Sequence, residues 1–118
     1  MNRNKLSGLT YSDGDFVYKE PQRYILPDSI KLMGREVQIE YIDKEYMSSM
    51  GMYIEKKNLI QIDNSMHQAI QERTLIHEVV HAILIDLGEQ ELNNNEGFVE
   101  RLANMVHLFI KDNKRIIV

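Results

Sequence analysis

A nearly apolar stretch from Thr74 to Leu87 carries the pattern H-E-x-x-H, and no other feature of the sequence limits its folding as strongly. The pattern is formed by His77, Glu78 and His81. On a helix, residues four apart lie one above the other on the same face, so both imidazoles can reach one metal ion. Two histidines on a buried helix would otherwise each need a polar partner, so we interpret the pair as ligands of one shared ion.

The residue types of the pattern indicate zinc. Neutral imidazole suits zinc, whose tetrahedral site needs one or two further ligands. The chain has no cysteine, which excludes both thiolate ligands and disulfides. Glu78 directly follows His77 and therefore points about 100° away around the helix. From there we expect it to act as general base on a metal-activated water rather than to bind the ion.

The third protein ligand must be a histidine or an acid near the pair. The candidates are His67, Asp86, Glu89, Glu91, Glu96, Glu100 and His107. His67 lies ten residues before His77, about 15 Å along the helix, and Asp86 points away from the metal face. Glu96 and Glu100 are four apart at the start of a returning helix, so both project on one side. We expect Glu96 to bind the ion and Glu100 to accept the free ring N–H of His77, and the reverse assignment stays open.

The length and charge of the chain define its class. Its 118 residues suit one domain with a modest core. The net charge of −4 gives no reason to expect nucleic acid or an anionic membrane as partner. No apolar run approaches the roughly 18 residues that span a bilayer, and the polar N-terminus lacks the core of a signal peptide. We therefore expect a cytoplasmic protein, of a state of assembly that the sequence leaves open.

The first part of the chain predicts an extension followed by two hairpins. Residues 1–21 have little periodicity and predict a flexible extension, with a possible short strand at Phe16–Tyr18, and residues 22–118 predict a single domain. Residues 30–33 and 36–42 predict one hairpin, turning at Gly34-Arg35, with Val37, Ile39 and Tyr41 on its buried face. Residues 43–49 predict a connector or short helical turn, and residues 50–55 and 59–63 predict a second hairpin.

The second part predicts two helices. The first runs from about Met66 to Leu87, with a capping box of Ser65 and Gln68 at its start and Gly88 at its end. Residues 89–95 predict a polar loop, and residues 96–112 predict an antiparallel helix with an inward stripe of Phe98, Leu102, Met105 and either Val106 or Phe109. The apolar tail Ile116–Val118 has no predicted place. The expected fold class is α+β, a small antiparallel or mixed sheet packed on the central helix and the C-terminal helix.

The motif and the acids that follow it carry a family resemblance. With His77-Glu78-x-x-His81 followed by Asn95-Glu96 and then Glu100, the sequence resembles the zincin metallopeptidases of the glutamate-zincin type. Over about residues 30–112 it is similar to the small ImmA/IrrE-like peptidases of phages and mobile elements. The metzincin pattern is not met, because Leu84 and Leu87 stand where its glycine and third histidine would fall.

The resemblance implies a minimal zincin-like fold and a zinc-dependent endopeptidase that acts on a protein or peptide. It also implies that the substrate adds as a strand to an edge strand, for which Met50–Glu55 is the candidate. ImmA-like members act on repressor proteins of their own mobile element, a role that reaches this chain by analogy alone. The donor for the oxyanion stays open among Tyr46, Tyr53 and His107. A non-catalytic, zinc-bearing regulatory or interaction module is the alternative, and an interaction protein without metal is a third.

Overall fold

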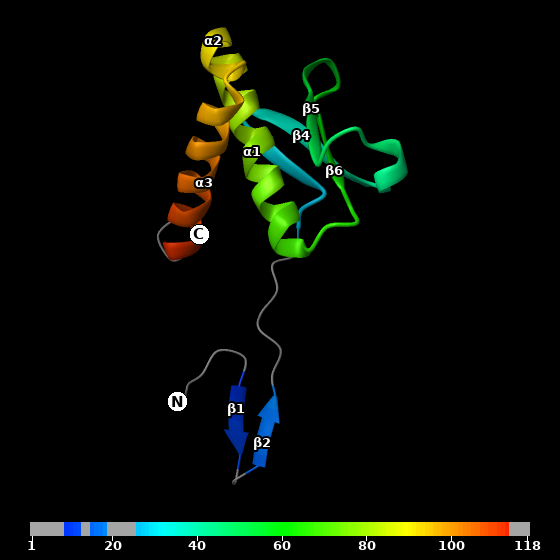
Figure 1. Cartoon of the computed structure of the whole chain (residues 1–118), viewed down its shortest axis with the longest axis vertical. Helices are drawn as coiled ribbons and strands as arrows, with labels where there is room; N and C mark the ends of the chain where they lie inside the picture. Colours follow the sequence, from blue (N-terminus) through cyan, green and yellow to red (C-terminus); the bar gives the residue numbers. More distant parts are fainter. Residues whose placement is uncertain (1–8, 13–14, 19–25, 114–118) are drawn as a thin grey trace.

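The computed structural model describes residues 9–12, 15–18 and 26–113. Its strands are β1 (Leu9–Ser12), β2 (Asp15–Tyr18), β3 (Ser29–Leu32), β4 (Arg35–Ile42), β5 (Gly51–Ile54) and β6 (Leu59–Asp63). Its helices are α1 (Gln68–Asp86), α2 (Gln90–Asn93) and α3 (Glu96–Asp112), with short 3₁₀ turns at η1 (Lys44–Tyr46) and η2 (Glu55–Lys57) (Figure 1). The predicted α+β class is confirmed. None of the described helices is long and apolar enough to cross a membrane.

The predicted N-terminal extension contains a hairpin within its described residues. β1 and β2 pair antiparallel, with Leu9 opposite Tyr18 and Ser12 opposite Asp15. The short strand predicted at Phe16–Tyr18 is confirmed as part of β2, whereas β1 was not predicted. The rest of the extension, its boundary at residue 21 and the tail Ile116–Val118 lie outside the described residues.

A mixed four-stranded sheet forms one layer of the fold, in the order β3-β4-β6-β5. The two predicted hairpins, β3–β4 and β5–β6, are confirmed, and the parallel pair β4–β6 joins them. The β3–β4 turn is formed by Met33 and Gly34, one residue before the predicted Gly34-Arg35, because Arg35 already pairs with Leu32. The φ values of Met33 and Gly34, 49° and 80°, are typical of a type I′ turn. This sheet leaves β5 as an edge strand.

The helix α1 lies between the sheet and α3 (Figure 1). One side of α1 packs on the sheet through a cluster that includes Val37, Ile39, Ile60, Ile62, Leu75 and Ala82. The other side packs on α3 through Val80, Leu84, Val99 and Ala103. A helix buried on two sides must be apolar almost all round, which is the pattern that the sequence has from Leu75 to Leu87.

The predicted capping box at the start of α1 is wrong. The N-cap is His67, which makes no side-chain cap hydrogen bond. Ser65 instead donates from its backbone N and its Oγ to Asp63 Oδ1, at 2.9 and 2.7 Å. These bonds hold the pKa of Asp63 below its ordinary value. A serine finds an acceptor two residues away more readily than one across a helical turn, so local turn geometry sets the start of α1.

Two predictions for the C-terminal part are also wrong. The predicted loop 89–95 contains α2. On α3, Leu102, Met105 and Phe109 of the predicted inward stripe are 36%, 65% and 56% exposed. The inward residues are Val99 and Ala103, followed by the half-buried Val106 and Ile110. Phe98 also packs against this buried cluster, so Phe98 and the alternative Val106 of the predicted stripe are confirmed. The buried face is therefore one residue, about 100° of helical rotation, from the predicted one.

Candidate metal centre and cleft

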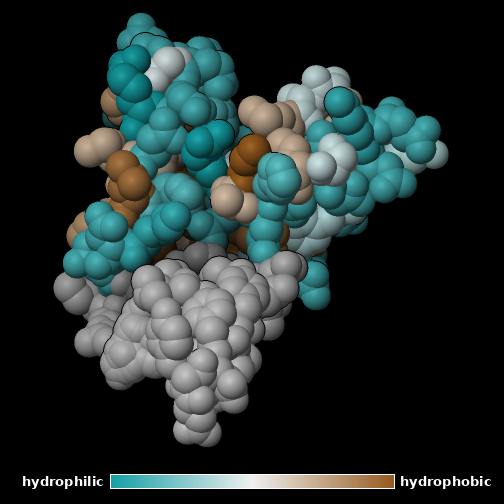
Figure 2. Space-filling model, turned by 60° about the horizontal axis from the view of Figure 1, so that its bottom comes forward, coloured by the Kyte–Doolittle hydropathy of each residue, from teal (hydrophilic) through white to brown (hydrophobic). Residues whose placement is uncertain are grey.

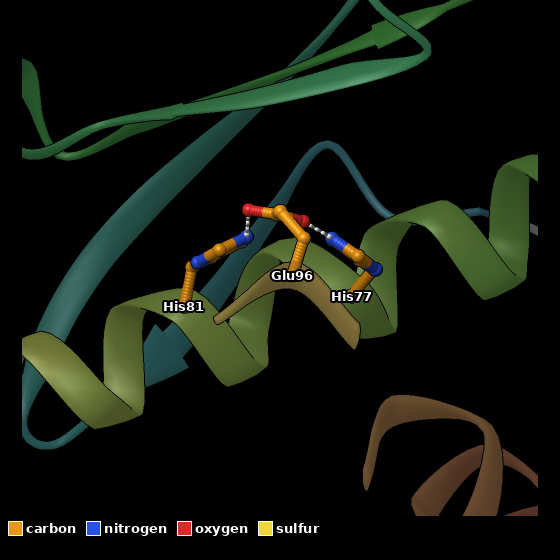
Figure 3. A group of neighbouring side chains, drawn as sticks. All are labelled: His77, His81 and Glu96. Atoms are coloured by element: carbon orange, nitrogen blue, oxygen red, sulfur yellow. Dashed lines mark hydrogen bonds and ion pairs between the residues drawn. The ribbon is translucent and has the colours of Figure 1, made fainter. Parts of the chain in front are cut away.

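Three side chains converge where α1 and the first turn of α3 meet. His77 Nε2 lies 3.2 Å from Glu96 Oε1, and His81 Nε2 lies 3.1 Å from Glu96 Oε2 (Figure 3). One ligand atom from each of the three residues lies within 4.8 Å of the others. The structure thus brings His77, His81 and Glu96 into a group that could hold a metal ion.

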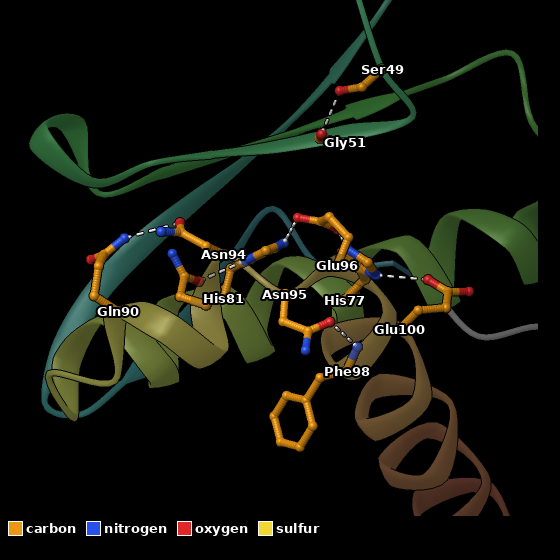
Figure 4. Close-up of polar contacts among 11 residues, drawn as sticks. Ser49, Gly51, His77, His81, Gln90, Asn94, Asn95, Glu96, Phe98 and Glu100 are labelled. Carbon is orange, nitrogen blue, oxygen red and sulfur yellow. Dashed lines mark hydrogen bonds and ion pairs between the residues drawn. The ribbon is translucent and has the colours of Figure 1, made fainter.

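The antiparallel course of α3 brings Glu96 to the histidines. His81 contacts Glu96 and His77 contacts Glu100, so α1 and α3 run in opposite directions. Asn95 caps α3, because its Oδ1 accepts a hydrogen bond of 3.0 Å from the backbone N of Phe98 (Figure 4). The cap starts the helix immediately before Glu96 and directs this first-turn carboxylate at the pair.

Each histidine has an outer partner on its other ring nitrogen. His77 Nδ1 lies 2.9 Å from Glu100 Oε1, and His81 Nδ1 lies 2.7 Å from Asn93 Oδ1. Both partners are acceptors, so a neutral ring that donates from Nδ1 directs its Nε2 lone pair toward Glu96. Two imidazole nitrogens and a carboxylate are a donor set that fits a divalent metal ion.

Glu78 lies beside this group, buried at 7% exposure. Its burial raises the pKa of its carboxyl above the ordinary value, and the charge of Glu96 acts in the same direction. The rings of His81 and His77 and a hydrogen bond from the backbone N–H of Tyr53 lower the pKa. A buried carboxylate with a raised pKa accepts a proton more readily than an exposed one, which suits Glu78 to the chemistry of a general base.

A cleft of about 570 Å³ opens over these residues between α1 and β5. Figure 2 shows a hollow between the helical part and the sheet, with hydrophobic and hydrophilic residues side by side. The lining residues are Ser49, Met50, Gly51, Met52, Tyr53, Arg73, Thr74, His77, Glu78, His81, Ile85, Asn93, Glu96 and Glu100. His77, His81 and Glu96, hereafter the metal group, and Glu78 thus face a space large enough for part of a peptide.

The free edge of β5 borders this cleft. Met50 O accepts a hydrogen bond from Asp63 N on β6. Since backbone groups alternate in direction along an antiparallel strand, Gly51 and Tyr53 present theirs on the side away from β6. The Oγ of Ser49 donates to Gly51 O at 2.7 Å (Figure 4), and the N–H of Tyr53 donates to Glu78. Of the outward main-chain groups of Gly51 and Tyr53, the Gly51 N–H and the Tyr53 C=O are therefore left for a further strand next to Glu78.

The structure places the other candidate ligands elsewhere. Asp86 pairs with Arg35 at 2.7 Å, and His107 Nε2 lies 2.6 Å from Glu72 Oε1. His67, at the start of α1, and the exposed acids Glu89 and Glu91 lie outside the metal group.

The structure places only one of the three candidate oxyanion donors at the cleft. Tyr53 lines the cleft, but its hydroxyl accepts a hydrogen bond of 3.4 Å from Arg35 Nη2. Tyr46 is 74% exposed and lies outside the cleft lining. His107 is also outside this lining, so Tyr53 alone of the three lies at the site.

Three residues of the site were missed in the sequence. Asn93 was missed because its segment predicts a loop, and Gly51 because a glycine in a strand has no signal of what approaches it. Arg73 had a signal. It lies four residues before His77, so the same rule that pairs the histidines places it on the cleft face of α1.

Comparison of the chain with protein-family models, curated proteins and solved structures finds no match. The case for a function therefore depends on the geometry of the site.

Proposed function

We propose that the protein is a zinc-dependent endopeptidase. The observation that supports this best is the position of Glu78: a buried carboxylate, adjacent in sequence to one ligand of the His77, His81 and Glu96 group, at the base of an open cleft. A metal site that serves stability alone has no need of a base or of an opening beside it.

In this proposal, different residues bind the ion, orient its ligands and transfer the proton. Zinc, when bound, supplies a Lewis acid that lowers the pKa of water and polarises a carbonyl group. His77, His81 and Glu96 would hold it, while Glu100 and Asn93 fix the orientation of the two rings. Glu78 accepts the proton of the attacking water and passes it to the nitrogen of the leaving amine.

The substrate is a protein or peptide in extended conformation. We propose that it adds to β5 as a further strand and pairs with the Gly51 N–H and the Tyr53 C=O, the outward main-chain groups of these two residues that Ser49 and Glu78 do not engage. An edge strand gives affinity for any backbone, so the side chains around the cleft must decide which sequence is cut.

The test compares the wild-type protein with Glu78→Gln at equal zinc content, which is measured by elemental analysis. The substrate is an internally quenched library of synthetic ten-residue peptides. We expect cleavage by the wild type and a loss of about 10²- to 10⁴-fold in rate for the variant. Equal zinc in both proteins with no difference in cleavage would contradict the proposal and favour a non-catalytic, zinc-bearing interaction module.

A further inference from the structure

The face of α1 toward the cleft has a different chemistry at each end. Arg73, His77, His81 and Ile85 line the cleft and follow one another at intervals of four residues. They therefore form one row along the helix, with a cation first, the two metal-ligating rings in the middle and an apolar side chain last.

Arg73 is the one lysine or arginine among the described residues that line the cleft. Its side chain is exposed and makes no ion pair with any other described residue. The acids of the lining, Glu78, Glu96 and Glu100, all contact the histidines or lie between them in sequence. The positive charge of Arg73 is thus available to a ligand in the cleft.

The direction of β5 decides which part of a bound peptide reaches Arg73. Gly51 lies against Thr74 and Glu78, the N–H of Tyr53 donates to Glu78, and the Tyr53 hydroxyl shares Arg35 with Asp86. The strand β5 therefore runs in the same direction as α1. A peptide that pairs antiparallel with β5, the stronger arrangement, runs against α1 and has its C-terminal part near Arg73.

The spacing sets how far from the cleaved bond that contact falls. Arg73 lies six residues before the midpoint of His77 and His81, which is about 9 Å along the helix. An extended peptide advances about 3.3 Å per residue, so about three residues cover this distance.

We propose that Arg73 selects substrates with an acidic residue within the three positions that follow the cleaved bond. The proposal rests on the proposed peptidase function and adds the class of sequence that it cuts. A guanidinium pairs with a carboxylate through two parallel hydrogen bonds, whereas a lysine or arginine of the peptide at the same place is repelled.

The experiment uses the same quenched ten-residue library, with product ends read by mass spectrometry. Then two synthetic peptides that differ by aspartate or lysine in this region are compared as the ratio of their kcat/KM values. Wild-type protein is expected to favour the aspartate peptide about tenfold, Arg73→Gln to lose most of this preference, and Arg73→Glu to reverse it. The preference should weaken as salt is added.

Arg101→Glu is the matched control, because Arg101 is an exposed arginine on α3 outside the cleft lining. It changes the net charge equally and should keep the wild-type ratio. Cleavage with the same ratio in wild type, Arg73→Gln and Arg73→Glu would overturn this inference and leave the peptidase function in place. Cleavage that Glu78→Gln does not reduce would overturn the peptidase function and, with it, the role of Arg73.

Discussion

The two histidines of the centre have unequal outer partners. His77 is bonded to the carboxylate of Glu100, whereas His81 is bonded to the neutral amide oxygen of Asn93. A carboxylate raises the basicity of the ring more than an amide does, while both fix the proton on Nδ1. Glu96 is the single anionic member of the group that could hold an ion, and an amide at His81 keeps a further negative charge away from the nearby buried Glu78.

We predict that Asn93→Leu weakens zinc binding by about 10- to 100-fold, because the His81 ring loses the acceptor that orients it. Asn93→Asp keeps an acceptor and should retain the affinity. Asn94→Leu is the control, because this exposed neighbour accepts a hydrogen bond from Gln90 Nε2 through its Oδ1 and lies outside the cleft lining. Competition with a chromophoric chelator measures the affinities of the wild type and the three variants, and equal values for Asn93→Leu and wild type would refute the role of Asn93.

At this scale the sequence predicts the residues that share one helix or one turn. The spacing of His77 and His81 fixes their common face, and the spacing of Glu96 and Glu100 fixes theirs. Asn93 is the last residue of the short helix α2, which connects α1 to α3 and places its side chain beside His81. The sequence has no apolar period in this segment from which to predict the helix. Contacts that depend on the path of the segment between two helices therefore cannot be predicted from residue spacing.

Among the elements, β5 approaches α1 closely at Gly51. A Cβ on Gly51 would lie 2.5 Å from Thr74 Cγ2 and 3.2 Å from Glu78 Cγ. Thr74 is β-branched and buried on a helix, so its methyl group has little freedom to move. The absence of a side chain at residue 51 is what allows the free edge of β5 to reach the buried carboxylate.

We predict that Gly51→Ala displaces β5 from α1, costs about 1 to 3 kcal/mol of stability and lowers peptidase activity. Adding Thr74→Ser removes the obstructing methyl group and should recover most of both losses, a coupling that a double-mutant cycle of melting temperature and rate will measure. Gly97→Ala is the control, because its Cβ would lie 3.2 Å from the flexible end of Arg101 and at an ordinary contact distance of 3.5 Å from Asn95 Oδ1. Additive effects of the two substitutions would show that this contact does not hold β5 in place.

The rotation of α3 shows why the inward stripe was predicted wrongly. The sequence offers an apolar stripe at Phe98, Leu102, Met105 and Phe109, and hydrophobicity alone would bury it. In the structure Glu96 and Glu100 face the histidines, which turns the small Ala103 toward α1 and leaves the larger Leu102, Met105 and Phe109 exposed. The polar contacts at one end of α3 thus decide the face that packs, and apolar periodicity has no information on them.

Across the whole molecule, the sheet, α1 and α3 form three layers, and the metal group spans the boundary between the last two. The α1–α3 layer rests on Val80, Leu84, Val99 and Ala103, a small apolar cluster. At its other end the pair His107 and Glu72 joins the same two helices. The small apolar cluster supplies only part of the free energy that holds α1 against α3. An ion bound by both helices would stabilise this interface further.

We therefore predict that zinc raises the melting temperature of the protein. At a free concentration 100 times its Kd, a ligand that binds the folded state alone adds about 2.7 kcal/mol. For a domain of this size the shift is on the order of 10 °C, measured by calorimetry before and after a chelator. His81→Ala should abolish the shift because it removes a ligand, whereas His67→Ala, which changes an exposed histidine outside the metal group, should keep it. A chelator that leaves the melting temperature of the zinc-loaded wild type unchanged would mean that the ion does not link α1 to α3, and a shift that survives in His81→Ala would place the stabilising ion at another site.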